Sequence, residues 1–106
     1  MPFRLFRVRG RSMLPTLADG DYVLARRLTP RRRATLSSDA IVCVDHQDHG
    51  RMIKRTARVT GGRCELTSDG QLGADSSSLG QVSLDRVTHV AWASISPSGV
   101  KRLSKN

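Results

Sequence analysis

Residues 40–67, AIVCVDHQDHGRMIKRTARVTGGRCELT, contain three short apolar segments separated by two turns. The segments at 40–45, 51–60 and 63–67 are rich in β-branched residues, which favour strands over helices. The polar residues 45–50, DHQDHG, separate the first two segments, and Gly61-Gly62 separates the last two. Both are typical of tight turns between antiparallel strands. The stretch therefore predicts two consecutive β-hairpins.

The rest of the chain repeats this pattern of short apolar segments between turn residues. No segment of ten or more residues has a 3.6-residue apolar period, so no long helix is expected. We predict an all-β domain, coiled or partly barrel-like, over residues 1–97, followed by a frayed basic tail at 98–106. Further strands are expected at 3–8, 22–27 and 89–95, a short element at 82–87, and loops at 29–38 and 68–78.

The charge balance indicates the classes of partner. The 106 residues carry 18 lysines and arginines against 9 acidic residues, a net charge of +9. This excess suits nucleic acid, an anionic membrane surface or an acidic substrate. Arginines gather at 26–27 and 31–33, where a solvated face is the simplest interpretation and an acidic partner or membrane surface the alternative. Nucleic acid is disfavoured because no aromatic pair is placed for base stacking.

Neither a membrane anchor nor a secretion signal is evident in the sequence. No apolar run approaches the roughly 20 residues that span a bilayer. Residues 1–7 lack the apolar core of a signal peptide. We therefore expect a soluble, cytoplasmic protein.

The cysteines and histidines do not predict a metal or cofactor. Cys43 lies in an apolar segment and is expected to be buried, and a disulfide with Cys64 is not expected in a reducing compartment. His46 and His49 lie three positions apart in a polar turn, but a zinc site needs three or four ligands. The expected chemistry therefore uses protein side chains alone.

Ser12 lies in a corner that suits acyl transfer. Gly10 precedes it and allows close backbone approach, and Pro15 stiffens the exit from the corner. The backbone N–H of Ser12 would point at a developing oxyanion, with help from a backbone group of Gly10 or Arg11. Ser12 is therefore the candidate nucleophile.

Lys54 is the candidate base for this serine. Only three lysines occur in the chain, and arginine, which supplies the other positive charges, does not deprotonate in proteins. Lys54 follows the apolar residues Met52 and Ile53, so burial would lower its pKa, and the surrounding arginines would lower it further. A neutral lysine can take the proton of a serine hydroxyl.

These two segments resemble the Ser-Lys dyad peptidases, which include type I signal peptidases and repressor self-cleavage domains. Residues 12–17, SMLPTL, match the nucleophile motif, residues 38–42 resemble the strand that leads to the lysine, and residues 53–55 resemble the lysine motif. The resemblance covers about residues 8–95. It implies that Lys54 is the general base and that the substrate binds as an added strand. Met13, Met52 and Ile53 are the candidate walls of the substrate pocket.

The last motif of the family is altered in this chain. Residues 68–70 and 73–80 stand for it, and Asp75 and Ser76 match its supporting positions. Gly73 replaces the serine that orients the lysine in signal peptidases, and Ser77 replaces an arginine. The resemblance implies that a shifted serine, such as Ser76 or Ser78, orients Lys54, or that activity is impaired.

The resemblance implies a soluble serine endopeptidase that cleaves a leader peptide from another protein. Only eleven residues precede Ser12, with no Ala-Gly or Cys-Gly site, so self-cleavage is disfavoured. The chain is similar in type to small maturation proteases, including those of nickel-type superoxide dismutase. Two alternatives stay open: a basic β-barrel that binds nucleic acid or an acidic protein, and a degenerate peptidase that binds a peptide without cutting it.

Overall fold

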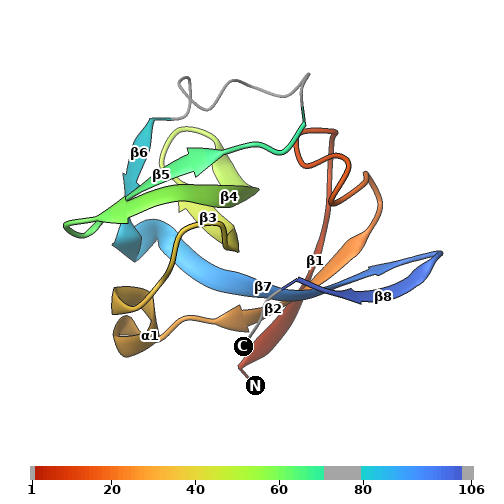
Figure 1. Cartoon of the computed structure of the whole chain (residues 1–106), viewed down its shortest axis with the longest axis horizontal. Coiled ribbons are helices and arrows are strands. Elements are labelled where there is room, and N and C mark those ends of the chain that lie inside the picture. The colour runs from red at the N-terminus through yellow and green to blue at the C-terminus, as the bar shows by residue number, and fades with distance from the viewer. Residues whose placement is uncertain (1, 71–79, 104–106) are drawn as a thin grey trace.

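A computed structural model describes residues 2–70 and 80–103. Its described residues are mostly in β-strands, as the sequence predicts, and helices are confined to two short turns (Figure 1). The elements are β1 (Phe3–Arg7), β2 (Tyr22–Arg27), α1 (Pro30–Ala34), β3 (Ile41–His46), β4 (Gly50–Thr60), β5 (Arg63–Thr67), β6 (Gln81–Ser83), the 3₁₀ turn η1 (Leu84–Arg86), β7 (Val87–Ser96) and β8 (Gly99–Arg102).

The strands form one antiparallel sheet in the order β1-β2-β7-β3-β4-β5-β6, with β8 also pairing with β7. Strand β7 joins the two halves, because it pairs with β2 along residues 89–95 and with β3 along residues 87–90. The halves curl toward each other, and the long loop between β1 and β2 lies beside the end of β5 (Figure 1). This open, coiled sheet confirms the predicted fold class.

Two clusters of buried side chains fill the coil, and β3 contributes to both. Ile41 and Cys43 enter one cluster, while Val42 and Val44 enter the other, because successive strand side chains point to opposite faces. The first cluster contains Phe6, Val8, Met13, Leu17, Val23, Ala25, Ile41, Cys43 and Ala91. The second contains Leu28, Val42, Val44, Cys64, Leu66, Val82 and Val87.

Both cysteines are buried and free, which confirms the prediction for Cys43. They lie in different clusters. Burial raises the pKa of Cys43 to about 12 and that of Cys64 to about 11. Each therefore packs as a small neutral side chain at physiological pH.

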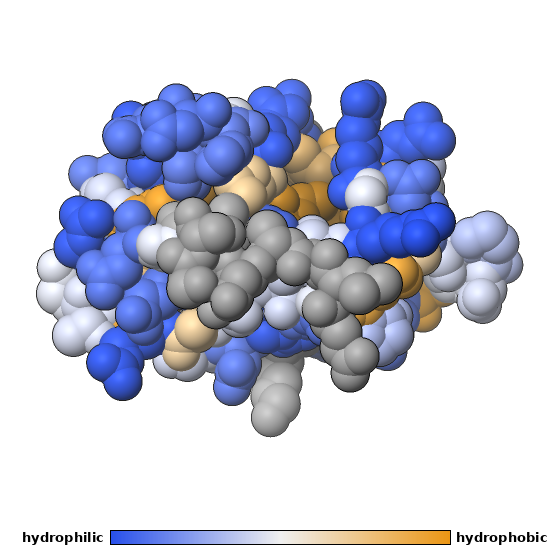
Figure 2. Space-filling model, turned by 90° about the horizontal axis from the view of Figure 1, so that it is seen from above, coloured by the Kyte–Doolittle hydropathy of each residue, from blue (hydrophilic) through white to orange (hydrophobic). Residues whose placement is uncertain are grey.

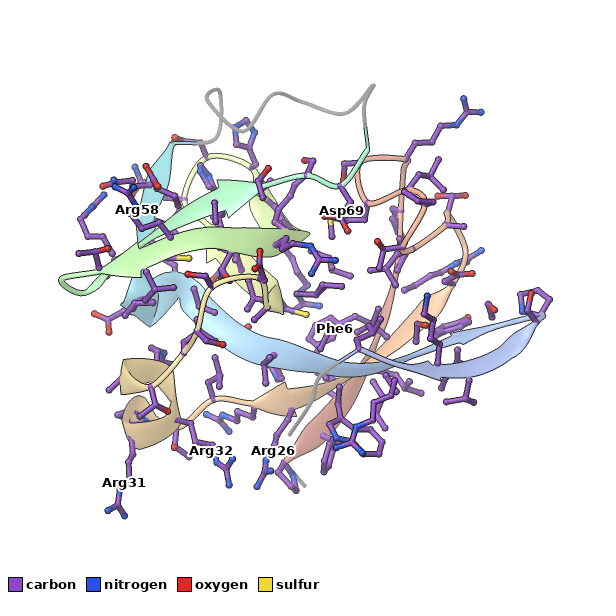
Figure 3. All side chains as sticks on the ribbon, in the orientation of Figure 1. Phe6, Arg26, Arg31, Arg32, Arg58 and Asp69 are labelled. Atoms are coloured by element: carbon purple, nitrogen blue, oxygen red, sulfur yellow. The ribbon has the colours of Figure 1, made fainter. Side chains whose placement is uncertain are left out.

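The loop expected at 29–38 is wrong at its start, where α1 forms one short turn of helix. Thr29 caps this helix, since its side chain accepts a hydrogen bond from the backbone N–H of Arg32, and Pro30 occupies the first turn. Thr-Pro is a recognised helix start. The three arginines that follow are split: Arg31 and Arg32 point outward (Figure 3), whereas Arg33 Nε donates to the carbonyl of Val87.

The frayed tail expected after Pro97 is also wrong, because residues 99–102 form β8 against β7. Gly99 has φ +123°, a conformation that glycine adopts readily at the turn between these strands. The guanidinium carbon of Arg102 lies 5.2 Å from the ring centroid of Trp92, and the N–H of Leu103 donates to the Trp92 carbonyl. These contacts hold the tail on the sheet as far as residue 103.

The helices in the described part of the chain are short, and none has the length and apolar character needed to cross a bilayer.

The polar turn at 46–49 is organised by His46, whose ring Nδ1 accepts hydrogen bonds from the backbone N–H groups of Asp48 and His49. That ring nitrogen is thus committed to the turn between β3 and β4.

Candidate active site

The loop between β1 and β2 carries Ser12 and is closed by backbone hydrogen bonds at its base. The N–H of Val8 donates to the Asp21 carbonyl at 2.8 Å, and the N–H of Gly20 donates to the Val8 carbonyl at 2.9 Å. Gly10, at φ +83°, donates its N–H to Asp19 Oδ1 at 2.8 Å. Gly10 therefore supports the loop by turning the chain just before the serine.

Two buried side chains anchor the same loop from below. Met13 and Leu17 are 2% and 0% exposed and belong to the cluster that also contains Phe6. The N–H of Leu17 donates to the Met13 carbonyl at 2.8 Å, and the Leu14–Pro15 peptide is cis. Ser12 is half-buried immediately before this anchor, so its position is fixed by the packing of its neighbour.

Lys54 lies within β4, opposite Val42 of β3, and is 6% exposed. Its Nζ donates to Ser68 Oγ at 3.0 Å. Burial lowers the pKa of the Lys54 ammonium, because a buried charge loses its hydration. The arginines expected from sequence to add to this effect do not contribute to it.

Ser12 and Lys54 open onto one groove between β1 and β4. The groove has a volume of about 470 Å³, and Met13, Met52 and Ile53 line it together with Ser12 and Lys54. Met13 and Ile53 also pack with the first cluster, and Met52 packs with the second. All five residues predicted as catalytic or pocket residues, from two segments about forty positions apart, therefore line one groove, and no hydrogen bond joins Ser12 to Lys54 in the described part of the chain.

The three residues after β5, Ser68, Asp69 and Gly70, connect both sides of this groove. Ser68 accepts the hydrogen bond from Lys54, Asp69 binds Arg55, and the N–H of Gly70 donates to the Ser12 carbonyl at 2.7 Å. A Cβ on Gly70 would lie 2.6 Å from the Arg11 carbonyl oxygen and 3.1 Å from that of Ser12. Only glycine fits this contact without moving the serine loop.

Asp69 ties the lysine strand to the serine loop (Figure 3). Arg55 donates to both of its carboxylate oxygens, from Nε at 2.8 Å and from Nη2 at 2.7 Å. Thr16 of the serine loop donates to Asp69 Oδ2 at 2.6 Å. The hydrogen bonds from Arg55 are the main cause of a lowered pKa for Asp69, so the carboxylate is charged at neutral pH.

The sequence missed Ser68 as the partner of Lys54. The resemblance points to Ser76 or Ser78 for that position, and Ser76, Ser78 and the supporting Asp75 lie outside the described residues. Ser68 stands where the family motif begins. The available signal was its place at the end of a strand paired with the lysine strand, since Thr67 lies opposite Arg55.

Some backbone N–H groups around Ser12 donate hydrogen bonds within the described part of the chain, and others have no acceptor there. The Gly10 N–H is engaged by Asp19, and the N–H of Ser12 has no acceptor among residues 2–70 and 80–103. Arg11 is exposed on the loop, and its carbonyl accepts the N–H of Leu14 at 3.2 Å. The Ser12 N–H is therefore one donor on this loop that can bind a developing oxyanion.

A family model described as Peptidase S24-like matches residues 3–80, from the start of β1 to the start of β6. The chain belongs to the Peptidase S24-like family. The family match includes both sides of the groove and places the chain in the Ser-Lys dyad peptidase superfamily that the sequence motifs predict. The comparison with curated proteins found no match.

Proposed function

We propose that this S24-like chain is a serine endopeptidase in which Ser12 is the nucleophile and Lys54 the general base. One observation carries the proposal: a half-buried serine and a buried lysine with a lowered pKa line one open groove. Lys54 is held by the neutral hydroxyl of Ser68. A carboxylate in that position would raise the pKa of the lysine and keep it charged.

The reaction begins when neutral Lys54 Nζ takes the proton of Ser12 as Ser12 Oγ attacks a peptide carbonyl. The open Ser12 N–H stabilises the oxyanion of the tetrahedral intermediate. The Lys54 ammonium then gives its proton to the leaving amine as the peptide bond breaks. Lys54, neutral again, takes a proton from water as that water attacks the acyl-enzyme. The Lys54 ammonium then gives this proton to Ser12 Oγ as the acid product leaves.

Ser68 would orient the base in each step. A neutral amine has one lone pair and two hydrogens, so donation of one hydrogen to Ser68 Oγ restricts where the lone pair points. The Gly70 contact fixes the other partner, because it holds the Ser12 carbonyl in place. One short segment therefore positions both members of the proposed dyad.

The substrate would bind as an added strand in the groove. In the described sheet, β1 pairs with β2 on one edge, and residues 51–54 of β4 pair with β3 before pairing with β5 begins at Arg55. The edges that face the groove therefore keep unpaired backbone groups, which an extended peptide can satisfy. Met13, Met52 and Ile53 would contact its side chains.

We infer that the substrate is the leader segment of another protein, cut in trans. Support comes from the groove, which no segment in the described part of the chain occupies as a strand. An open groove accepts an extended segment from a second molecule. The substrate must lack stable structure at the cleavage site, because both strand edges have to form hydrogen bonds with its extended backbone.

The test is cleavage of a library of extended peptides, read by mass spectrometry. Wild-type protein should cut a subset of the library, and both Ser12→Ala and Lys54→Met should abolish cleavage at every such site. Ser98→Ala, a change of an exposed serine in the turn before β8, is the matched control and should cut at the wild-type rate. Cleavage that persists in Ser12→Ala would exclude this mechanism.

A further inference from the structure

Arginines approach Phe6, a residue that lines the groove, from β1 and from β4. Arg4 of β1 and Arg51 of β4 both place the guanidinium carbon 5.1 Å from the ring centroid of Phe6. Phe6 is 5% exposed and points from β1 into the interior (Figure 3). Since the two arginines come from the two sides of the groove, their charges converge across it.

Arg27 of β2 adds a third positive charge beside them. Arg4 and Arg27 line a second cavity of about 450 Å³, together with Phe3, Thr88 and His89. The His89 ring centroid lies 5.0 Å from that of Phe6. Burial lowers the pKa of His89, and the charges of Arg4, Arg27 and Arg51 lower it further.

These three guanidinium groups are not neutralised by the described part of the chain. Its side-chain ion pairs within 4.0 Å are Arg55–Asp69 and Arg58–Glu65. Asp45 lies opposite Arg51 in the strand register, without an ion pair between them. Arg51 lines the groove, and Arg4 and Arg27 line the second cavity. Three neighbouring positive charges of this kind form a favourable site for an anion.

We propose that the groove selects peptides with an aspartate or glutamate side chain about three residues from the scissile bond, bound by Arg4, Arg27 and Arg51. This inference rests on the proposed function. Arg51 precedes Lys54 by three positions on β4, a distance of roughly 10 Å at the rise of a strand. An added peptide strand has the same rise, so its side chain about three positions from the reacting carbonyl reaches the arginines.

A peptide fits this site better than a small free anion. Arg51 lines a groove whose lining also includes Phe6, Val8, Met13 and Ile53, and whose strand edges have open backbone groups. Figure 2 shows apolar surface in hollows bordered by hydrophilic side chains. A ligand that combines a carboxylate, an extended backbone and small apolar side chains matches all three features.

Fluorescence anisotropy with labelled peptides tests the selection. One aspartate is moved along a neutral ten-residue peptide, and each peptide is paired with its asparagine analogue and titrated with the Ser12→Ala protein. We expect aspartate to tighten binding about tenfold at one or two neighbouring positions, as a charge-assisted hydrogen bond would. The preference should weaken with added salt.

Variants then locate the site. Arg4→Gln, Arg51→Gln and Arg27→Gln should each reduce the preference for aspartate, whereas Arg31→Gln, an exposed arginine on α1, should keep it. Thermal unfolding checks that each variant is folded. Equal binding of aspartate and asparagine peptides at every position, or an equal loss in Arg31→Gln, would overturn the inference.

Cleavage by wild-type protein separates the inference from the proposed function. Equal cleavage of aspartate and asparagine peptides would overturn the acidic preference and leave the peptidase assignment standing. Arginine-dependent binding of aspartate peptides without cleavage of any peptide would support the anion site and overturn the peptidase assignment.

Discussion

Lys54 is buried, whereas Lys101, on β8, is exposed. Lys54 lines the groove beside the apolar residues Met52 and Ile53. Its Nζ donates a hydrogen bond to the neutral hydroxyl oxygen of Ser68. Burial of a charged ammonium is unfavourable, so the folded state favours the neutral amine. The proposed base therefore comes at a cost in stability, which can be measured.

Replacement of Lys54 by methionine should stabilise the protein at pH 7, by about 1 kcal/mol. Because the folded pKa of Lys54 is lowered, the unfolded chain binds more protons between the two pKa values, and wild-type stability rises with pH across that window. The advantage of Lys54→Met should therefore shrink as pH approaches the ordinary lysine range. Chemical denaturation at several pH values measures this, with Lys101→Met as an exposed control. Parallel pH dependence of wild type and Lys54→Met would contradict the account.

Ser68 is a positioning residue in this account, and its removal should slow cleavage more than it affects folding. We expect Ser68→Ala to lower kcat about tenfold or more, because the amine loses its fixed orientation. Ser68→Thr keeps the hydroxyl and should recover most of the rate. The comparison of kcat and KM with thermal unfolding decides the matter, since a purely structural role predicts lost stability with kcat intact.

The sequence predicted that Ser12 and Lys54 belong to one site, but it did not predict the hydrogen bond that positions Lys54. Ser12 and Lys54 lie in recognisable motifs, and their shared groove follows from pairing of the strands around them. Ser68 was missed because a hydrogen bond between residues fourteen positions apart depends on where β5 ends, and no local pattern fixes that end.

Among the elements, the segment at 68–70 has the largest effect on the site, because it joins β4, β5 and the serine loop. Its three contacts act on three different partners: Lys54, Arg55 and Ser12. Such a segment transmits any displacement directly to the groove, since the surrounding interior is close-packed.

Gly70→Ala should damage the site more than the fold. The added Cβ would collide with the Arg11 carbonyl at 2.6 Å, so the serine loop must shift, and a shift of about 1 Å can cost roughly a hundredfold in rate. Gly61→Ala is the matched control: it has open space but φ +57°, so it should lower stability and leave the site intact. Rates corrected for the folded fraction compare the two. Wild-type kinetics for Gly70→Ala would contradict the predicted collision.

Asp69→Asn should lower the free energy of unfolding by about 2 kcal/mol, because it removes a charged acceptor that Arg55 of β4 and Thr16 of the serine loop share. The lowered pKa of Asp69 means that its stabilisation is complete above the ordinary carboxyl range and is lost as pH falls through the lowered value. The difference between the two proteins should therefore shrink in acid.

The exposed pair Arg58–Glu65, 3.9 Å apart, provides the control. Glu65→Gln should change stability by less than about 0.5 kcal/mol. An Asp69→Asn variant as stable as Glu65→Gln, at neutral pH, would show that the partly buried network of Arg55, Asp69 and Thr16 does not hold the loop.

The strands were predictable because β-branched segments and turn residues alternate along the chain. The two errors have local causes. The Thr29-Pro30 cap starts a helix of five residues, too short to show a 3.6-residue period. β8 is fully exposed along its length, so its sequence has no buried face to reveal it, and its pairing depends on Trp92 and Leu103.

In the whole molecule, the proposed dyad spans the two halves of the coiled sheet. Ser12 comes from the half that contains β1 and β2, and Lys54 from the half that contains β3–β6, with β7 as the shared strand (Figure 1). The groove therefore exists only when both halves are folded together. Cleavage activity should be lost in the same transition as the global fold.

The net charge of +9 suits nucleic acid, an anionic membrane surface or an acidic substrate, and it gives no location for any of them. The proposed anion site draws on three strands, through Arg4 of β1, Arg27 of β2 and Arg51 of β4. Of these, only Arg27 belongs to the arginine-rich stretches at 26–27 and 31–33. Their convergence on Phe6 and His89 is a property of the sheet order. Composition therefore leaves several classes of partner open, and the position of the proposed anion site follows from the fold alone.

Measurement of the Lys54 pKa would show whether this side chain can act as a neutral base for Ser12. With only three lysines in the chain, NMR of protein labelled with ¹³C at the lysine ε-carbons gives few signals, and the Lys54→Met variant assigns the one of interest. We expect the Lys54 signal to titrate at clearly lower pH than the other two, and we expect this difference to persist in Ser12→Ala. Three signals that titrate together in the ordinary lysine range would show that Lys54 is not a neutral base and would contradict the account.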